Sequence, residues 1–179
     1  MDLDQYLTNL KKVVLSLEGK IDSNIIAKFL KKIDTKKVTK EDNFTDHVCS
    51  FFMPVDLKNR KIYLGHHIKA NLWIPPGGHI KKGELPIKTV YREIIEELSY
   101  KITNEKVELF DLSITDIRGP NKPCYFHYDF WFAVFTGKKT FNVLKKEFYG
   151  ADWFDFSEAI TKINYPHYEK IIKRYLDRL

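Results

Sequence analysis

The sequence predicts a mixed α/β sandwich with an additional helical segment at its N-terminus. Three observations support this class: two stretches of helical periodicity come first, four strand-like stretches follow, and an amphipathic helix separates the strands into two pairs. A final helix closes the chain, so a sheet covered by helices is expected. The 179 residues suit one main domain, and 44% hydrophobic residues are sufficient for its core.

The first 43 residues are predicted to be a helical extension of a main domain that spans residues 44–179. Apolar residues recur at helical spacing from Leu3 to Leu17, and a second helix is predicted through residues 24–33 with Ser23 as its N-cap. An apolar stripe needs a surface to cover. We therefore expect the extension to pack against the main domain or a second subunit, and a homodimer is compatible with the sequence.

The main domain is predicted to alternate between strands and helices. Its strands are residues 47–55, 61–67, 107–117 and 124–137. The first pair is separated by the turn-like stretch DLKNR, and the second pair by the turn RGPNKP at residues 118–123. The final helix is expected from about Pro166.

The central helix follows a Pro-Pro-Gly-Gly turn at residues 75–78 and has Pro86 in its first turn. With 100° between successive residues, the apolar side chains are predicted to form one face and three glutamates the opposite face. The apolar residues are Val90, Tyr91, Ile94, Ile95 and Leu98, and the glutamates are Glu93, Glu96 and Glu97. Carboxylates this close repel one another, so they form either an ordinary solvated acidic face or a binding site.

The glycine turn favours the binding site. A turn that glycine tolerates best exposes backbone carbonyls beside the helix. Carboxylate and carbonyl oxygens together are hard ligands that suit Mg²⁺ or Mn²⁺.

The net charge and the cysteine content indicate which partners and which cellular compartment to expect. The net charge of +6 favours polyanionic partners such as phosphate esters, nucleotides or RNA, although the lysine run at residues 28–40 is more typical of a solvated helix face. No apolar run is long enough to span a membrane, and no secretory signal is recognised. Cys49 and Cys124 favour two buried thiols over one disulfide. A cytoplasmic protein is expected.

The spacing of the glycine, glutamates and arginine carries a family resemblance. Gly78, Glu84 and the run Arg92-Glu93-Ile94-Ile95-Glu96-Glu97 resemble the Nudix box, the signature of Nudix hydrolases. The pattern departs at Ser99, where the family usually has a glycine, and at Tyr100. Outside the box, the chain is similar to a bacterial Nudix subgroup with a helical N-terminal segment. The resemblance implies a Nudix-type α/β/α sandwich.

The resemblance also implies the metal ligands and the catalytic residues. The metal ligands would be the Gly78 carbonyl, Glu93, Glu96 and Glu97. Glu84 would support the site from behind the ligands, while Arg92 orients the glutamates. Glu96 also falls where a catalytic helper is usual. The family often has its general base outside the box, and Glu147 is the candidate, with an exposed loop glutamate as the alternative.

The implied reaction is Mg²⁺- or Mn²⁺-dependent hydrolysis of a phosphoanhydride in a nucleoside diphosphate linked to another group. Bound metal would neutralise the phosphate oxygens that otherwise repel a nucleophile. A nucleoside triphosphate pyrophosphatase is the alternative enzyme. An RNA-binding Nudix-fold module is a further alternative, which the complete glutamate set does not favour.

Four residues outside the box are candidate substrate contacts. Alternation along residues 126–132 puts His127 and Asp129 on one strand face, either as a satisfied polar pair or in the substrate cleft. Trp73 is either a core residue or a platform for a nucleotide base. Lys69 is either a contact for a phosphate group or an ordinary solvent-exposed residue at the end of a strand. The spacing of His79 to other histidines does not suggest zinc.

Overall fold

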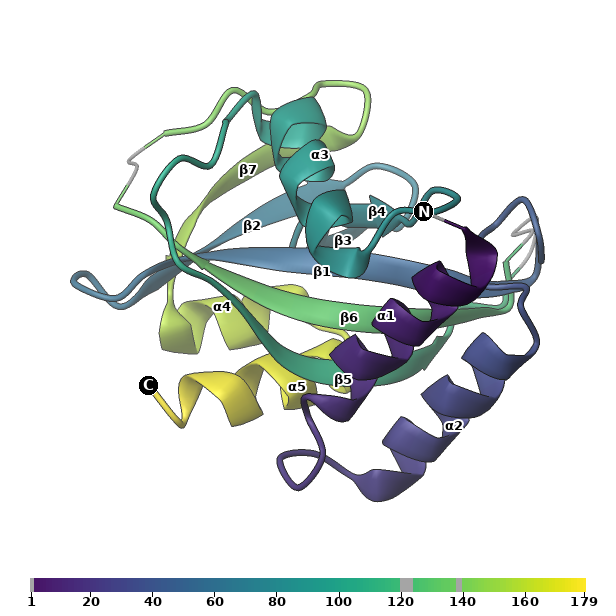
Figure 1. Cartoon of the computed structure of the whole chain (residues 1–179). Helices are drawn as coiled ribbons and strands as arrows, with labels where there is room; N and C mark the ends of the chain where they lie inside the picture. The colour runs from purple at the N-terminus through teal and green to yellow at the C-terminus, as the bar shows by residue number, and fades with distance from the viewer. Residues whose placement is uncertain (1, 120–123, 138–139) are drawn as a thin grey trace.

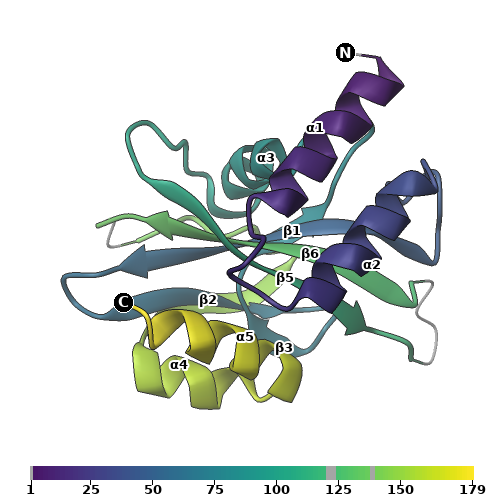
Figure 2. The ribbon, with the colours of Figure 1, turned by 60° about the horizontal axis from the view of Figure 1, so that its bottom comes forward.

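The computed structural model describes residues 2–119, 124–137 and 140–179. Within them, seven strands form one mixed sheet that lies between helices on both faces (Figures 1 and 2). The strands are β1 (Asp46–Asp56), β2 (Lys61–His67), β3 (Leu72–Ile74), β4 (Gly77–His79), β5 (Val107–Asp116), β6 (Phe126–Phe135) and β7 (Phe148–Asp155). Their order is β3-β2-β1-β6-β5, with β4 beside β1 and β7 beside β2.

The helices divide between the two faces of the sheet. They are α1 (Leu3–Leu15), α2 (Ser23–Asp34), α3 (Pro86–Leu98), α4 (Phe156–Ile163) and α5 (Pro166–Leu176). The first three pack with the even-numbered side chains of β1 and β6, whereas α4 and α5 pack with the odd-numbered ones. The prediction of a mixed sheet with helices on both sides is therefore confirmed, as is the presence of two N-terminal helices.

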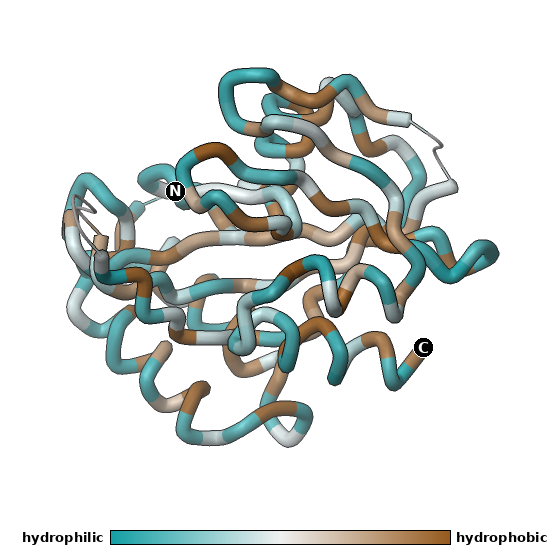
Figure 3. The backbone as a smooth tube through the Cα atoms, turned by 180° about the vertical axis from the view of Figure 1, so that it is seen from behind, coloured by the Kyte–Doolittle hydropathy of each residue, from teal (hydrophilic) through white to brown (hydrophobic). Residues whose placement is uncertain are grey.

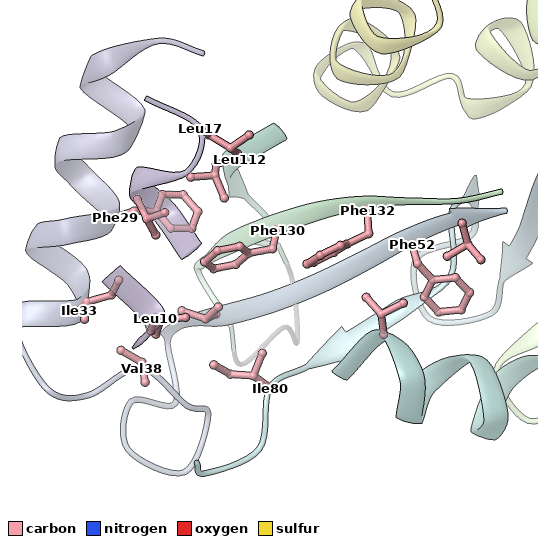
Figure 4. Close-up of a cluster of buried hydrophobic side chains, with 14 of the residues drawn as sticks. Leu10, Leu17, Phe29, Ile33, Val38, Phe52, Ile80, Leu112, Phe130 and Phe132 are labelled. Atoms are coloured by element: carbon pink, nitrogen blue, oxygen red, sulfur yellow. The ribbon is translucent and has the colours of Figure 1, made fainter. Parts of the chain in front are cut away.

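Helices α1 and α2 share one hydrophobic core with the rest of the chain. Phe29 of α2 is fully buried, and its ring lies edge-on to Phe130 of β6 with the centroids 5.2 Å apart (Figure 4). Tyr6 of α1 donates a 3.1 Å hydrogen bond to the backbone carbonyl of Glu84. The apolar stripe of the extension thus covers the sheet, as expected from its need for a partner surface.

Several local features differ from the sequence prediction. The side chain that caps α2 is Asp22, which accepts from the Asn24 amide, so the prediction of Ser23 as the cap is wrong. Strands β3 and β4 are not predicted, because three residues are too few to show a period, and β7 and α4 are also absent from the prediction. Of the predicted turn at 118–123, residues 120–123 lie outside the described part of the chain.

Strand β4 explains the paired glycines better than a free turn does. It runs antiparallel to β1, with Gly78 opposite Ser50 and His79 opposite Cys49. A Cβ on Gly77 would lie only 2.3 Å from the Ser50 carbonyl oxygen, so glycine permits the close approach of the two backbones.

The turn between β1 and β2 projects from one end and is coloured hydrophilic in Figure 3. Among the described residues, no helix has the length and apolar character needed to cross a membrane.

Candidate active site

Helix α3 brings two of the three glutamates into the protein. Glu93 and Glu97 are 8% and 5% exposed, whereas Ile95 is 50% exposed. The prediction that all three glutamates lie opposite the apolar face is therefore wrong. Glu93 and Glu97 flank the stripe formed by Val90 and Ile94 and face β4, and Glu96 stays at the surface with 47% of its side chain exposed.

Strand β4 and the buried glutamates are in direct contact. The Gly77 amide donates a 2.9 Å hydrogen bond to Oε2 of Glu97. The Glu93 carboxylate lies against Gly78, because a Cβ added to that glycine would be 2.1 Å from Glu93 Oε1. A backbone segment and two carboxylates therefore form one compact group.

Arg92 holds this group together. Its Nε and Nη2 donate to the two carboxylate oxygens of Glu84 at 3.0 and 2.9 Å, and Nη2 also donates to the His79 carbonyl at 3.1 Å. Nη1 donates to Glu93 at 2.5 Å and to Glu96 at 3.3 Å. One guanidinium thus fixes the loop, β4 and two glutamates of α3 in one arrangement.

Glu84 is anchored independently of the arginine. Its Oε2 accepts from the Lys81 amide at 3.0 Å and from Oγ1 of Thr89 at 2.9 Å. These bonds and the Arg92 guanidinium lower the pKa of Glu84 in spite of its partial burial, which on its own raises it. Glu84 is therefore a fixed anion behind Arg92.

The surroundings of the two buried glutamates do not fully compensate the negative charges of their ionised forms. Burial raises the pKa of Glu97 well above its usual range, and the Glu93 charge raises it further. Burial also raises the pKa of Glu93, although Arg92 opposes this. Two buried carboxylates beside the Gly78 backbone supply the oxygen donors that a hard divalent cation prefers, so the donor set fits Mg²⁺ or Mn²⁺.

Glu96 does not converge on the same point as the other two glutamates. Within the described residues, the carboxyl oxygens of Glu93, Glu96 and Glu97 are not all within 4.8 Å of one another. Glu96 instead lies 3.7 Å from Lys81 and 3.3 Å from Arg92. Its place is at the rim of the site.

Glu147, which directly precedes β7, and Lys69, from the segment between β2 and β3, lie close to each other. The Ile68 amide donates a 2.8 Å hydrogen bond to the Glu147 carbonyl, which ties the two segments together. The Glu147 carboxylate lies 3.7 Å from both Lys69 Nζ and His67 Nε2. Its negative charge contributes to the raised pKa of Glu97, so the two carboxylates lie within electrostatic range of each other.

The other predicted substrate contacts lie elsewhere. His127 and Asp129 are odd-numbered residues of β6, so they lie on the sheet side opposite α3. Asp129 is fully buried and accepts hydrogen bonds from Ser113 and Thr115, and burial raises its pKa to about 7. Trp73 of β3 is partly buried, and its ring stacks on His66 with the centroids 5.2 Å apart.

Comparison with known proteins agrees with this architecture. A model of the NUDIX domain matches residues 40–175. No curated protein sequence matches the chain. The structure of the E. coli dihydroneopterin triphosphate pyrophosphohydrolase is similar with a TM-score of 0.65 at 12% identity, over 74% of this chain and 96% of that one.

Two further solved structures show the same fold. A NUDIX-family hydrolase from Clostridium perfringens has a TM-score of 0.57 at 21% identity, over 74% of this chain and 97% of its own. A C. elegans Ap4A hydrolase in a binary complex has a TM-score of 0.58 at 14% identity, over 73% and 96%. At these identities the likeness is one of fold.

The fold of this chain is thus shared with solved hydrolases of the NUDIX family. Because the family model covers most of its length, the chain belongs to the NUDIX domain family. It is therefore an enzyme of the class that acts on phosphoanhydride bonds.

Proposed function

We propose that this enzyme hydrolyses the diphosphate bond of a nucleoside diphosphate linked to another group, with Mg²⁺ or Mn²⁺ as its cofactor. The observation that carries the proposal is the pair of buried carboxylates, Glu93 and Glu97, held against the β4 backbone beside Arg92. A bound divalent cation would neutralise phosphate charge and lower the pKa of a water molecule.

The residues around the pair have separate roles in this proposal. Glu93, Glu97 and the Gly78 carbonyl hold the cation, and Glu96 adds a carboxylate at the rim. Arg92 does not touch the substrate. It fixes the Glu93 carboxylate by a 2.5 Å hydrogen bond and is itself fixed by Glu84.

Glu147 is proposed as the general base. Its segment is joined to α3 by the hydrogen bond from the Leu144 amide to the Glu97 carbonyl, and 29% of its side chain is exposed, so it can accept a proton from a water molecule that attacks phosphorus. Lys69 lies 3.7 Å from Glu147 with 76% of its side chain exposed. We assign it to the phosphate groups, whose negative charge it complements.

Trp73 is proposed to bind the nucleotide base. The indole and His66 form a stacked pair at the edge of the sheet, and Tyr149, which is 67% exposed, lies 5.1 Å from His66. Tyr149 is the exposed ring of this group, and exposed aromatic rings stack readily on bases. Asp129 takes no part in the proposal, because it is enclosed and already bonded to Ser113 and Thr115.

A substrate panel tests the reaction. The full-length protein is incubated with Mg²⁺ and nucleotide sugars, ADP-ribose, dinucleoside polyphosphates or nucleoside triphosphates, and the products are separated. We expect a nucleoside monophosphate and a phosphorylated second group from one of the first three classes, with Glu97→Gln nearly inactive. Pyrophosphate released only from triphosphates would instead identify the alternative enzyme. Equal rates in the wild type and Glu97→Gln would contradict the proposed site.

A further inference from the structure

The sheet face opposite the glutamates carries a second cluster of metal-binding side chains. His47 of β1, His79 of β4, His127 of β6 and Cys124 each offer one ligand atom, and these four atoms lie within 4.8 Å of one another. The three imidazole rings are mutual neighbours, with centroid separations of 4.5, 5.0 and 5.2 Å. No step of the proposed reaction uses them.

Sheet pairing produces this convergence. His47 and His127 are direct partners in the parallel register of β1 and β6, so their side chains point to the same face. His79 is opposite Cys49 in the antiparallel pairing of β4 with β1, two residues further along. Cys124 lies two residues before β6 and is 6% exposed.

His47 is oriented as a metal ligand. Its ring is fully buried, and Nδ1 lies 3.1 Å from the Asn43 carbonyl oxygen. A carbonyl only accepts, so Nδ1 carries the proton and Nε2 of the neutral ring keeps its lone pair. Burial, which lowers the pKa of His47, favours this neutral form.

That lone pair has no protein donor to satisfy it. Within the described residues, Nε2 of His47 is buried and has no hydrogen-bond partner. A buried polar atom without a partner is uncommon and unfavourable. A cation at the centre of the cluster would satisfy Nε2, and the Asn43 carbonyl would orient the ring from behind, as second partners of metal-bound histidines do.

We propose that His47, His79, His127 and Cys124 form a structural Zn²⁺ site. Three imidazole nitrogens and one sulfur are the donor types that Zn²⁺ takes in four-coordinate sites, with bonds of about 2.0–2.1 Å to nitrogen and about 2.3 Å to sulfur. On binding, the Cys124 thiol releases its proton to solvent, since only the thiolate is a good ligand. His79 and His127 are only partly buried, which leaves a route for the ion.

A second group on the same face competes for His127. Cys49, His127 and Asp129 also place ligand atoms within 4.8 Å of one another. Asp129 accepts from Ser113 and Thr115 through Oδ2, whereas within the described residues its Oδ1 has no hydrogen-bond partner; this group has three members rather than four. The four-membered cluster with the orphaned His47 nitrogen is therefore the site we assign, and Cys49 provides the matched control.

The proposed zinc ion would cross-link several segments of the sheet. The ion would join β1, β4, β6 and the segment before β6 at one point. Strand β4 has only three residues, and its His79 carbonyl is the acceptor of Arg92. Zinc on one face of β4 would thus hold in place the backbone that the glutamates use on the other.

Zinc content of purified full-length protein tests the proposal. After dialysis against excess Mg²⁺, we expect one zinc ion per chain by elemental analysis in the wild type, in Glu97→Gln and in Cys49→Ala. Cys124→Ala and His47→Gln should bind zinc at least tenfold more weakly. Because Glu97→Gln removes the other cation site and is assayed without substrate, the result is independent of the proposed hydrolysis.

A spectroscopic experiment on the wild type covers the case in which these variants do not fold. Co²⁺ in place of Zn²⁺ should give a thiolate-to-cobalt charge-transfer band together with the intense visible bands of a tetrahedral site. Added Zn²⁺ should abolish both, and zinc should raise the melting temperature of Glu97→Gln. Absence of the charge-transfer band, or zinc loss in Cys49→Ala in place of Cys124→Ala, would overturn the assignment.

Discussion

The Glu93 carboxylate occupies the space where a side chain at position 78 would begin: a Cβ on Gly78 would lie 2.1 Å from Glu93 Oε1. Arg92 fixes that carboxylate by a 2.5 Å hydrogen bond, so the glutamate cannot move aside without losing its partner.

Gly78→Ala should therefore damage the site more than the fold. The displaced atom is the end of a flexible side chain, so we expect a small fall in melting temperature but at least a tenfold loss of kcat. Gly150→Ala is the matched control, because nothing lies within 4 Å of a Cβ there. Steady-state kinetics and melting curves of both variants measure the difference. Full activity in Gly78→Ala would show that Glu93 is not held as described.

Divalent cations should stabilise the wild-type protein. Burial and mutual repulsion disfavour the charged forms of Glu93 and Glu97, and a cation that binds only the folded state offsets this. At about 100 times its Kd, Mn²⁺ should add about 2.7 kcal/mol to the free energy of unfolding. Glu97→Gln should lose most of this gain, yet be at least as stable as the wild type without metal. Glu18→Gln, at an exposed position, should behave as the wild type does.

Arg92→Lys should lower activity although the charge is kept. Lysine cannot reproduce the paired bonds to Glu84 while also reaching the His79 carbonyl and Glu93. We expect kcat to fall about 10–100-fold, as for other residues that orient metal ligands. A kcat within twofold of the wild type would contradict the role of Arg92 in orienting the glutamates.

Removal of the Phe29 ring should destabilise the whole protein. The ring is fully buried against Phe130, so Phe29→Ala should reduce the free energy of unfolding by about 3–5 kcal/mol. Deletion of residues 1–43 should have a larger effect and expose the same sheet surface. Leu15→Ala, at a position 42% exposed, should change stability by less than about 0.5 kcal/mol. Denaturant titrations compare the three.

Ser99→Gly should stabilise the end of α3. Ser99 has a φ of 50° and a ψ of 38°, the left-handed conformation that glycine adopts without strain. We expect a gain of about 0.5–1 kcal/mol with nearly unchanged kcat, and no gain in Ser99→Ala. A large loss of activity in Ser99→Gly would reveal a role for the hydroxyl group.

The sequence was sufficient for the elements that have a clear period or a local motif. The helices around Leu10, Phe29 and Tyr168 and the strands β1, β2, β5 and β6 follow from apolar spacing, whereas β7 and α4 were not predicted. The alternation of Phe130 and Trp131 between two cores is confirmed. The lysine run is mainly a solvated face as interpreted, although Lys32 is buried and donates to the Asp46 carbonyl.

Tertiary pairing determined what the sequence did not show. His47, His79 and His127 are separated by 32 and 48 positions in the printed sequence, and only the registers of β1 with β4 and β6 bring them together. The position of the glutamates on α3 differs from the prediction for a simpler reason. With 100° of rotation per residue, Glu97 lies only 20° from Val90 around the helix axis. Its side chain therefore borders the apolar stripe and does not lie opposite it.

Gly78 and His79 are neighbours in β4, and together they connect the two faces of the sheet. Neighbouring residues of a strand point to opposite faces, so Gly78 meets α3 while His79 turns toward the histidine cluster. A slip of β4 by one position along β1 would exchange these faces, drive an imidazole into the glutamates and leave the histidines without their third ring. Insertion or deletion of a single residue between Ile74 and Ile80 should therefore disable both faces of β4 at once, whereas a substitution of Gly78 or His79 acts first on the face to which that residue belongs.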